Sequence, residues 1–299
     1  ALRFLASTGL LYLRYLFFKP RLSNEKIRYQ MKAFVGELIG TFVLTLFGCG
    51  SVAVAVLFGE YGSIFQIALV WGIGVTLAIY LTRHLSCAHL NPAVTVAMVL
   101  SKRMKADKLL PYLLAQFAGA FLAGAVLYGL LAPTISAYEL AHGIVRGTEA
   151  SIDTARMFGE FYPNPGDSMA VVSMPLAMVA EGFGTFLLVM FIFALTEGCN
   201  VGRPSDTMAP VFIGLSVSSI ICLIAPLTQA GLNPARDFGP RLVSWLAGWG
   251  EVAFPDACCG GFFFVYILAP ILGGAVAAYA LTYVCLLYTS PSPRDGLLS

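Results

Sequence analysis

Apolar residues occur in long runs along the chain, and the shorter segments between them hold most of the charged residues. A run of about 20 apolar residues is long enough to cross the hydrocarbon core of a bilayer as a helix. Six runs approach or exceed this length: residues 33–57, 64–81, 109–131, 171–195, 208–225 and 262–286. The pattern therefore predicts an all-α membrane protein with six transmembrane helices.

Two shorter apolar segments begin with the tripeptide Asn-Pro-Ala, at Asn91-Pro92-Ala93 and at Asn233-Pro234-Ala235. Each segment is about ten residues long, which is too short to span a bilayer. Asparagine is a favourable N-cap and proline is tolerated at the first helical position, so each tripeptide is expected to begin a re-entrant half-helix. Irregular backbone at membrane depth is tolerated only where it lines a cavity or is buried in protein.

The two parts of the chain carry the same features in the same order. Glu37 lies in Gly-Glu-Leu-Ile-Gly-Thr-Phe and Glu181 in Ala-Glu-Gly-Phe-Gly-Thr-Phe, and each precedes an Asn-Pro-Ala tripeptide at nearly the same distance. The halves, 33–131 and 171–286, each contain three spans and one half-helix. Because three is an odd number, the second half inserts upside down, which makes an inverted repeat.

The repeat defines the expected domain as residues 33–286. Residues 1–32 include an apolar stretch interrupted by Arg3 and Arg14, so we expect an interfacial or disordered extension there. Residues 287–299 change abruptly in composition, and we expect a disordered tail or an assembly scar.

The charges of the connections predict the orientation. Basic residues gather before the first span and between the second and third spans, whereas the 132–170 connection is acidic. The positive-inside rule then places both termini in the cytoplasm and the 132–170 connection outside an inner or plasma membrane.

Composition supports a lipid environment and excludes several other classes. The chain is 58% hydrophobic and 11% charged, whereas soluble domains carry about 25% charged residues. The net charge of +2 gives no reason to expect a nucleic-acid partner. The 7 cysteines and 3 histidines have neither disulfide-framework nor metal-ligand spacing, so we expect no metal site and no enzyme active site.

Function is predicted from the paired Asn-Pro-Ala tripeptides. Inverted halves bring the two half-helix N-termini together at the membrane midplane, and each N-terminus carries about half a positive charge. Two such ends repel cations and protons. The side-chain amides of Asn91 and Asn233 can each donate to a passing hydroxyl or water oxygen.

Two acidic residues lie inside predicted spans, where a charge is costly and usually has partners. We expect Glu37 and Glu181 to accept N–H bonds from residues 86–90 and 229–232, which would turn the carbonyls of these segments toward a lumen. A structural ion pair, a protonated core acid and a proton relay are the alternatives for these carboxylates.

Four further polar residues lie beside the tripeptides. Arg236 is expected to face water at the outer constriction and donate to solute oxygens, with a structural role as the alternative. His89 is interpreted either as a lining residue of the inner vestibule or as a packing residue. Asp237 and Arg241 share a helix face and are expected to form a local ion pair or to contact solute.

These motifs resemble the aquaporin superfamily and, within it, the bacterial glycerol facilitators. The resemblance covers about residues 34–283 and includes Ile144-Val145-Arg146-Gly147, Tyr162-Pro163-Asn164-Pro165 and the sequence from Asn233 to Arg241. It implies a passive channel without a cofactor, embedded in lipid and assembled as a homotetramer with one pore per subunit. Asp237, Arg241 and Pro270-Ile271 match the glycerol branch.

The resemblance also places an outer selectivity filter on Trp71, Ile221, Ala230 and Arg236. Trp71 and Arg236 match the glycerol facilitators, whereas Ala230 stands where an aromatic residue is usual and Ile221 where glycine is usual. The set is similar to plant nodulin-type intrinsic proteins. An apolar wall opposite an arginine suits solutes with one alkyl side and one hydroxyl side.

The expected function is therefore passive diffusion of glycerol, water and other small neutral solutes such as urea, boric acid or arsenous acid. A water-selective aquaporin is the alternative. A secondary transporter would need a coupling-ion site, and the spans hold no acid cluster beyond Glu37 and Glu181. Opposed half-helix N-termini and Arg236 argue against an ion channel.

Overall fold

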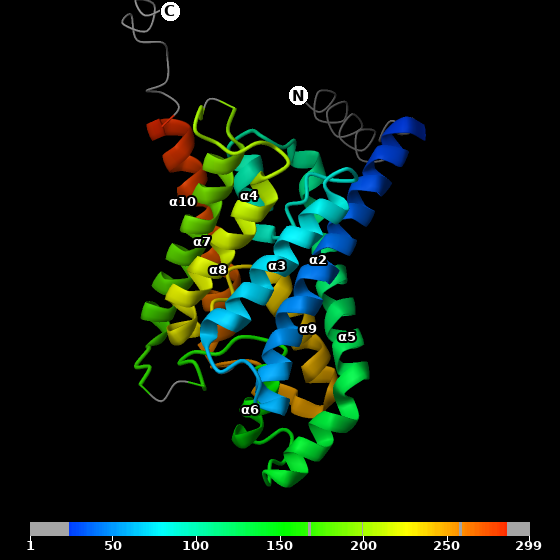
Figure 1. Ribbon diagram of the computed structural model, residues 1–299, viewed down its shortest axis with the longest axis vertical. Coiled ribbons are helices and arrows are strands. Elements are labelled where there is room, and N and C mark those ends of the chain that lie inside the picture. The colour runs from blue at the N-terminus through cyan, green and yellow to red at the C-terminus, as the bar shows by residue number, and fades with distance from the viewer. Residues whose placement is uncertain (1–23, 167–168, 199, 257–258, 286–299) are drawn as a thin grey trace, which may run out of the picture.

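The computed structural model describes residues 24–166, 169–198, 200–256 and 259–285. Residues 1–23 of the extension expected over 1–32, and the tail expected over 287–299, lie outside these residues. Within the described residues the secondary structure is helical throughout, and the long helices run side by side along the longest axis of the molecule (Figure 1).

Six helical segments are long and apolar enough to cross a membrane. The five continuous ones are α2 (Asn24–Phe58), α3 (Ile64–Thr82), α5 (Leu109–Ala141), α7 (Met174–Thr196) and α8 (Ala209–Thr228). The sixth consists of η6 (Phe263–Leu268), α10 (Ala269–Tyr279) and η7 (Ala280–Cys285). The outer faces of these helices expose large apolar side chains, among them Leu77, Leu130, Val179, Phe183, Leu223 and Leu272. Such a surface fits lipid and not water.

The two half-helices are α4 (Pro92–Leu100) and α9 (Pro234–Ser244), and they enter from opposite ends. In Figure 1, α4 lies in the half of the molecule that holds the start of α2, and α9 lies in the other half. Each half-helix packs on the last long helix of the other half, α4 on α10 and α9 on α5. This exchange interlocks the two halves, as an inverted repeat requires.

Glycines allow the long helices of each half to approach closely. A Cβ added at Gly119 of α5 would lie 2.2 Å from the carbonyl oxygen of Leu38 in α2. A Cβ added at Gly273 of α10 would lie 1.9 Å from the carbonyl oxygen of Gly182 in α7. The same small-residue contact therefore occurs at matching places in the two halves, and such contacts drive helix packing where lipid removes the hydrophobic force.

Several helix ends differ from the sequence prediction. Helix α2 begins at Asn24 rather than at residue 33, because polar residues continue the same helix beyond its apolar part. Helix α5 continues to Ala141 rather than ending at residue 131, although Pro133 lies inside it. The carboxylate of Glu139 explains the extension, because it accepts hydrogen bonds from Arg146 and Thr154 and so anchors the end of the helix.

The connection after α5 is folded back onto the molecule. It contains η2 (Glu149–Ser151) and α6 (Ile152–Ala155), and the guanidinium of Arg146 lies 4.0 Å from the centre of the Trp249 ring. Beyond α6, Phe158 and Phe161 are buried in the main hydrophobic core together with Trp71. Part of the 132–170 connection therefore belongs to the hydrophobic core at one end of the molecule.

Candidate functional site

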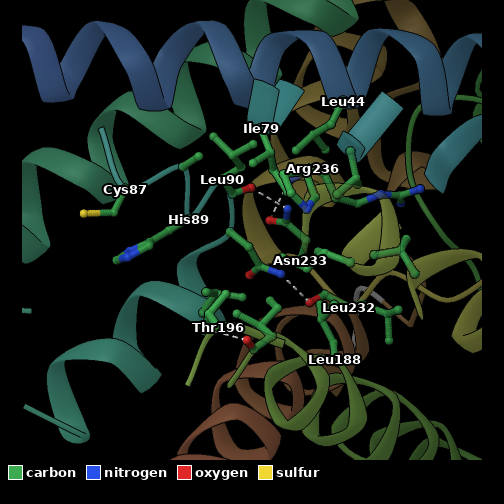
Figure 2. Close-up of a pocket in the computed structure, with 18 of the residues that line it drawn as sticks. Leu44, Ile79, Cys87, His89, Leu90, Leu188, Thr196, Leu232, Asn233 and Arg236 are labelled. Atoms are coloured by element: carbon green, nitrogen blue, oxygen red, sulfur yellow. Dashed lines mark hydrogen bonds between the residues drawn. The ribbon is translucent and has the colours of Figure 1, made fainter. Parts of the chain in front are cut away.

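A cavity of about 450 Å³ runs through the interior between the long helices. One end is framed by Arg83, Arg103, Thr196 and Asp206, and the other end by Trp71 and Arg236. Its walls are mostly aliphatic, with Leu44, Val75, Ile79, Val94, Leu188, Ile192, Ile213 and Val217 among the lining residues. Figure 2 shows His89, Leu90, Leu232 and Asn233 along this cavity.

The two Asn-Pro-Ala tripeptides meet in the middle of the cavity. Asn91 caps α4 by accepting from the Ala93 N–H at 2.8 Å, and Asn233 caps α9 by accepting from the Ala235 N–H at 3.1 Å. Each side chain also crosses to the other half. Asn91 Nδ2 donates to the Leu232 carbonyl at 3.0 Å, and Asn233 Nδ2 donates to the Leu90 carbonyl at 2.8 Å.

These cross-bonds fix the two half-helix N-termini against each other. Both asparagines line the cavity, and each amide carries two N–H donors, of which the cross-bond uses one. One donor from each asparagine therefore remains for a molecule in the cavity. The partial positive charges of both helix N-termini point toward the same place.

Glu37 holds the irregular segment ahead of α4. Its Oε1 accepts from the His89 N–H at 3.0 Å and its Oε2 accepts from the Leu90 N–H at 2.8 Å. The hydroxyl of Ser86 and the side-chain amide of Gln116 donate to the same carboxylate, each at 2.8 Å. Glu37 is completely buried, so these four donors replace the water that a carboxylate would otherwise bind.

Glu181 does the same for the segment ahead of α9. Its Oε1 accepts from the Thr228 hydroxyl at 2.6 Å and the Gly231 N–H at 2.9 Å, and its Oε2 accepts from the Leu232 N–H at 2.7 Å. The N–H bonds expected from the sequence are thus present in both halves. The bonds join each carboxylate to loop groups rather than to a basic side chain.

The segments that the two carboxylates hold contain strained backbone. Ala88 and Leu90 have φ values of 49° and 55°, and Ala230 and Leu232 have φ values of 64° and 56°. A left-handed residue other than glycine costs roughly 1–2 kcal/mol. The hydrogen bonds to Glu37 and Glu181 offset this cost, and they keep the carbonyls of Leu90 and Leu232 where the asparagines can reach them.

Trp71, Ile221, Ala230 and Arg236 all line the cavity, at the end opposite Arg83 and Asp206. The guanidinium carbon of Arg236 lies 3.9 Å from the centre of the Trp71 ring. The ring itself packs on Gly48, where an added Cβ would lie 2.1 Å from its atoms. Trp71 and Arg236 are only 5% and 4% exposed, so both side chains are enclosed by protein at this end of the cavity.

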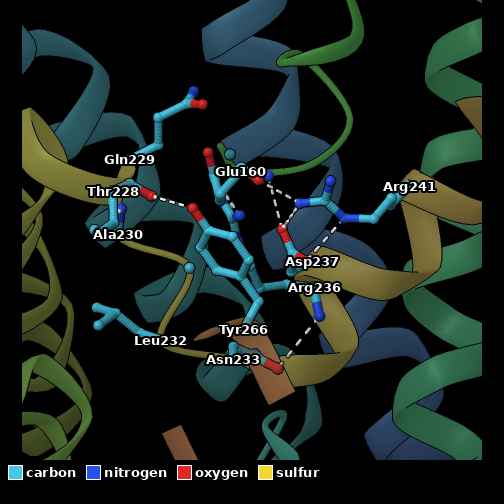
Figure 3. Close-up of polar contacts among 12 residues, drawn as sticks. Glu160, Thr228, Gln229, Ala230, Leu232, Asn233, Arg236, Asp237, Arg241 and Tyr266 are labelled. Atoms are coloured by element: carbon cyan, nitrogen blue, oxygen red, sulfur yellow. Dashed lines mark hydrogen bonds and ion pairs between the residues drawn. The ribbon is translucent and has the colours of Figure 1, made fainter. Parts of the chain in front are cut away.

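Glu160 is a charged residue at this end that the sequence analysis did not single out. Its carboxylate forms an ion pair with Arg236, and both side chains are 5% exposed. Figure 3 shows Glu160 close to Arg236, Asp237 and Arg241. A signal was present in the sequence, because Glu160 is the one charged residue in the stretch from Met157 to Pro165.

Asp237 and Arg241 are completely buried behind the cavity and do not line it. Arg241 Nε and Nη2 donate to the two carboxylate oxygens of Asp237 at 3.0 and 2.8 Å. Arg241 Nη2 also donates to the Glu160 carbonyl at 2.5 Å, and Asp237 accepts from the Glu160 N–H at 2.7 Å. The pair therefore holds the backbone of Glu160 in place, and the expected local ion pair is present.

The opposite end of the cavity is polar. His89 lines it, and the His89 Nδ1 has no hydrogen-bond partner among the described residues. Arg83 Nη1 donates to the Asp206 carbonyl at 2.6 Å. A hydrogen bond from Arg203 lowers the pKa of the Asp206 carboxyl, so this carboxyl is charged at neutral pH. Among the described residues, no group of three histidine, cysteine or acidic residues could hold a metal ion.

Comparisons with known proteins agree with this geometry. The family model for the major intrinsic protein family matches residues 24–283. The glycerol uptake facilitator protein of Escherichia coli (strain K12) is 42% identical over 246 residues, which are 82% of this chain and 85% of that protein. The propanediol uptake facilitator PduF of Salmonella typhimurium is 38% identical over 260 residues, 87% of this chain and 95% of that protein.

A solved structure has the same fold. The aquaglyceroporin from Plasmodium falciparum superimposes with a TM-score of 0.74 at 27% sequence identity. The match covers 87% of this chain and 98% of that one. The likeness therefore extends over the spans, the half-helices and the connections between them.

Proposed function

This chain belongs to the major intrinsic protein family, the aquaporin superfamily, in the glycerol-facilitator branch, and from this premise we propose that its cavity conducts glycerol and similar small neutral solutes by passive diffusion. Members of this family are multi-pass membrane channels and not enzymes. Glycerol and propanediol appear in the names of its relatives, and both are short polyols.

The observation that carries the proposal is that the cavity combines many aliphatic lining residues, called here the apolar wall, with a smaller set of polar groups, called the polar line. Ile79, Leu188 and Val217 belong to the apolar wall. The polar line consists of Arg236, the two asparagines and the loop segments that the buried carboxylates hold. A short polyol has a carbon chain on one side and hydroxyls on the other. It can therefore exchange its hydration for these contacts without leaving polar groups unpaired.

The same arrangement opposes the passage of ions and protons. Two half-helix N-termini and Arg236 place positive charge along the passage. A water molecule that accepts from both Asn91 and Asn233 has no lone pair left for its neighbour, which interrupts a chain of proton transfer. Aliphatic walls offer no ligands to replace the hydration shell of a cation.

Water is the second candidate solute, and one observation favours it. The guanidinium carbon of Arg236 lies 3.9 Å from the centre of the Trp71 ring, and both side chains are almost completely buried, so little space separates the two groups. Ile221 adds bulk to the same end of the cavity. If the filter keeps this width during transport, water passes more readily than a polyol.

Uptake of labelled glycerol into cells that express the chain tests the proposal. A passive channel gives uptake that rises linearly with glycerol concentration and does not change when an uncoupler removes the proton gradient. Saturable uptake that the uncoupler abolishes would favour a secondary transporter. Cells that do not express the chain give the background uptake.

We further propose a homotetramer in which residues 33–286 of each subunit form one pore. The exposed apolar faces of the long helices support the assembly, because part of this surface can pack against a neighbouring subunit. Both termini are proposed to lie in the cytoplasm, since the basic connections lie at the end that holds Arg83 and Arg103. Native mass measurement in detergent tests the tetramer, and thiol labelling of Cys87 from either side tests the orientation.

A further inference from the structure

Trp71 and Arg236 are the side chains that line one end of the cavity. Among the described residues, none between His142 and Ser173 lines it, although the connection from α5 to α7 lies over this end. At this end of the cavity the guanidinium carbon of Arg236 lies 3.9 Å from the centre of the Trp71 ring, and both side chains are almost completely buried.

Glu160 contacts Arg236 from the connection that covers this end. Their ion pair is almost completely buried, with each side chain 5% exposed. A buried ion pair is costly to break by removal of one partner, because the other charge is left without compensation. The contact of Arg236 with the Trp71 ring is a cation–π interaction, which is the weaker of the two. The carboxylate is therefore the main determinant of where the guanidinium lies.

The backbone around Glu160 is fixed on both sides of the passage. On the α9 side, its N–H donates to Asp237 and its carbonyl accepts from Arg241. On the α8 side, the Phe161 N–H donates to Gln229 Oε1 at 2.9 Å, and Asn164 Nδ2 donates to the Ala225 carbonyl at 2.7 Å. The carboxylate is thus presented to Arg236 from a rigid support.

The other charged groups near the Glu160–Arg236 ion pair already have partners. Asp237 and Arg241 bind each other through two hydrogen bonds, and Arg241 lies within 5.5 Å of the ring centres of Phe161, Phe262 and Tyr266. Asp237 is therefore engaged with Arg241 and with the Glu160 N–H. Glu160 is the carboxylate that forms an ion pair with Arg236 in the described residues.

We propose that Glu160 is a positioning residue that holds Arg236 across the outer end of the cavity, on the face of Trp71, and thereby sets the width of the filter and the relative passage of glycerol and water. The inference rests on the proposed function, because it assigns a role to a residue at the same filter. Glu160 acts through Arg236 and does not itself line the cavity.

The Glu160→Gln variant tests the proposal. Glutamine keeps the shape of the side chain and leaves the backbone bonds to Asp237 and Arg241 intact, but it removes the charge that holds Arg236. The Arg236 guanidinium then binds water in the passage in place of the lost carboxylate, and it moves away from the face of the Trp71 ring. Glu160→Asp keeps the charge on a shorter side chain. Glu149→Gln, at an exposed site in the same connection, is the matched control.

Stopped-flow light scattering on proteoliposomes measures the glycerol and water permeabilities and their activation energies. We expect Glu160→Gln to raise the glycerol-to-water permeability ratio severalfold and to lower the activation energy of glycerol passage. Glu160→Asp and Glu149→Gln should stay close to wild type. The ratio and the activation energy do not depend on how many channels fold, so a purely structural role of Glu160 would leave both unchanged.

An unchanged or lower ratio in Glu160→Gln would overturn the proposal, as would a Glu160→Asp variant that behaves like Glu160→Gln. Failure of the proposed function gives a different result, in which the wild-type protein passes water but no glycerol. In that case the activation energy of water passage in Glu160→Gln still decides whether Glu160 positions Arg236.

Discussion

At the scale of single residues, the two buried glutamates link strained backbone to the polar line of the cavity. Glu37 and Glu181 accept from loop N–H groups on residues whose left-handed conformation would otherwise be unfavourable. Each carboxylate accepts hydrogen bonds at both of its oxygens, whereas a neutral side chain of the same size, glutamine, has only one acceptor oxygen. This explains why an acid is placed where a charge is otherwise costly.

The Glu181→Gln variant tests this role. Its amide oxygen can still accept from Thr228 and Gly231, but its NH₂ group then faces the Leu232 N–H. One buried donor is left unpaired, which costs about 1–3 kcal/mol. We expect a lower unfolding temperature in detergent and a loss of glycerol permeability per folded protein. Glu149→Gln is again the control, and equal stability of the two variants would contradict the role given to Glu181.

At this scale, the sequence indicated four residues that line one end of the cavity, but not Glu160, which pairs with one of them. Trp71, Ile221, Ala230 and Arg236 could be placed by counting from motifs, because each lies in a helix or next to a tripeptide. Glu160 lies in an irregular connection, and its contact with Arg236 depends on how that connection folds back over α9. Periodicity carries no information on such a long-range contact.

At the scale of elements, the two half-helices are held by caps and by cross-bonds between the halves. Asn91 and Asn233 each supply an acceptor to their own helix and a donor to the other half. The Asn91→Asp and Asn233→Asp double variant keeps the caps, because aspartate is also a good N-cap. The double variant removes the side-chain N–H donors of both asparagines. It also adds negative charge where the two half-helix N-termini would otherwise repel cations.

We therefore expect the double variant to fold but to leak protons. A pH-sensitive dye enclosed in proteoliposomes reports this leak after a pH jump. The rate should rise severalfold above that of the wild type, which should equal the rate of protein-free liposomes. If protons leaked through the double variant no faster than through the wild type, the half-helix N-termini would not be the barrier to protons.

Close helix packing leads to a further expectation for the elements. Gly273→Ala would place a Cβ 1.9 Å from the Gly182 carbonyl oxygen, so α7 and α10 must separate. Overpacking of this kind costs typically about 1–3 kcal/mol. Gly129→Ala in α5 is the matched control, because nothing lies within 4 Å of the added Cβ. Thermal unfolding in detergent should show a lower midpoint for Gly273→Ala only, and equal midpoints would contradict the packing argument.

Element existence could be predicted from hydropathy, but several ends could not. The long apolar runs in the sequence predicted every span, because a helix must be long and apolar to cross a lipid bilayer. Hydropathy predicts that the third span ends at residue 131, because the apolar sequence there gives way to Pro133 and polar residues. The helix continues because Glu139 binds Arg146 and Thr154, which lie beyond the span. Interactions of this kind are tertiary and leave no periodic signal.

At the scale of the whole molecule, the inverted repeat places like elements on opposite sides of one passage. Packing of α4 on α10 and of α9 on α5 joins the halves, and the asparagine cross-bonds meet at their centre. The repeat in the sequence was sufficient to predict the inverted orientation of the second half, because an odd number of spans per half allows no other orientation. The contacts among Trp71, Glu160 and Arg236 were not predictable, since they depend on side-chain positions in segments far apart in the sequence.

The central claim is that this passage conducts a polyol, and stopped-flow light scattering on proteoliposomes tests it most directly. A sucrose gradient should cause rapid shrinkage by water loss, and a glycerol gradient should cause shrinkage followed by rapid re-swelling as glycerol enters. We expect the proteoliposomes to re-swell much faster than protein-free liposomes, with a low activation energy for glycerol entry. Rapid shrinkage in glycerol with re-swelling no faster than in protein-free liposomes would contradict it, and would identify the cavity as a water channel.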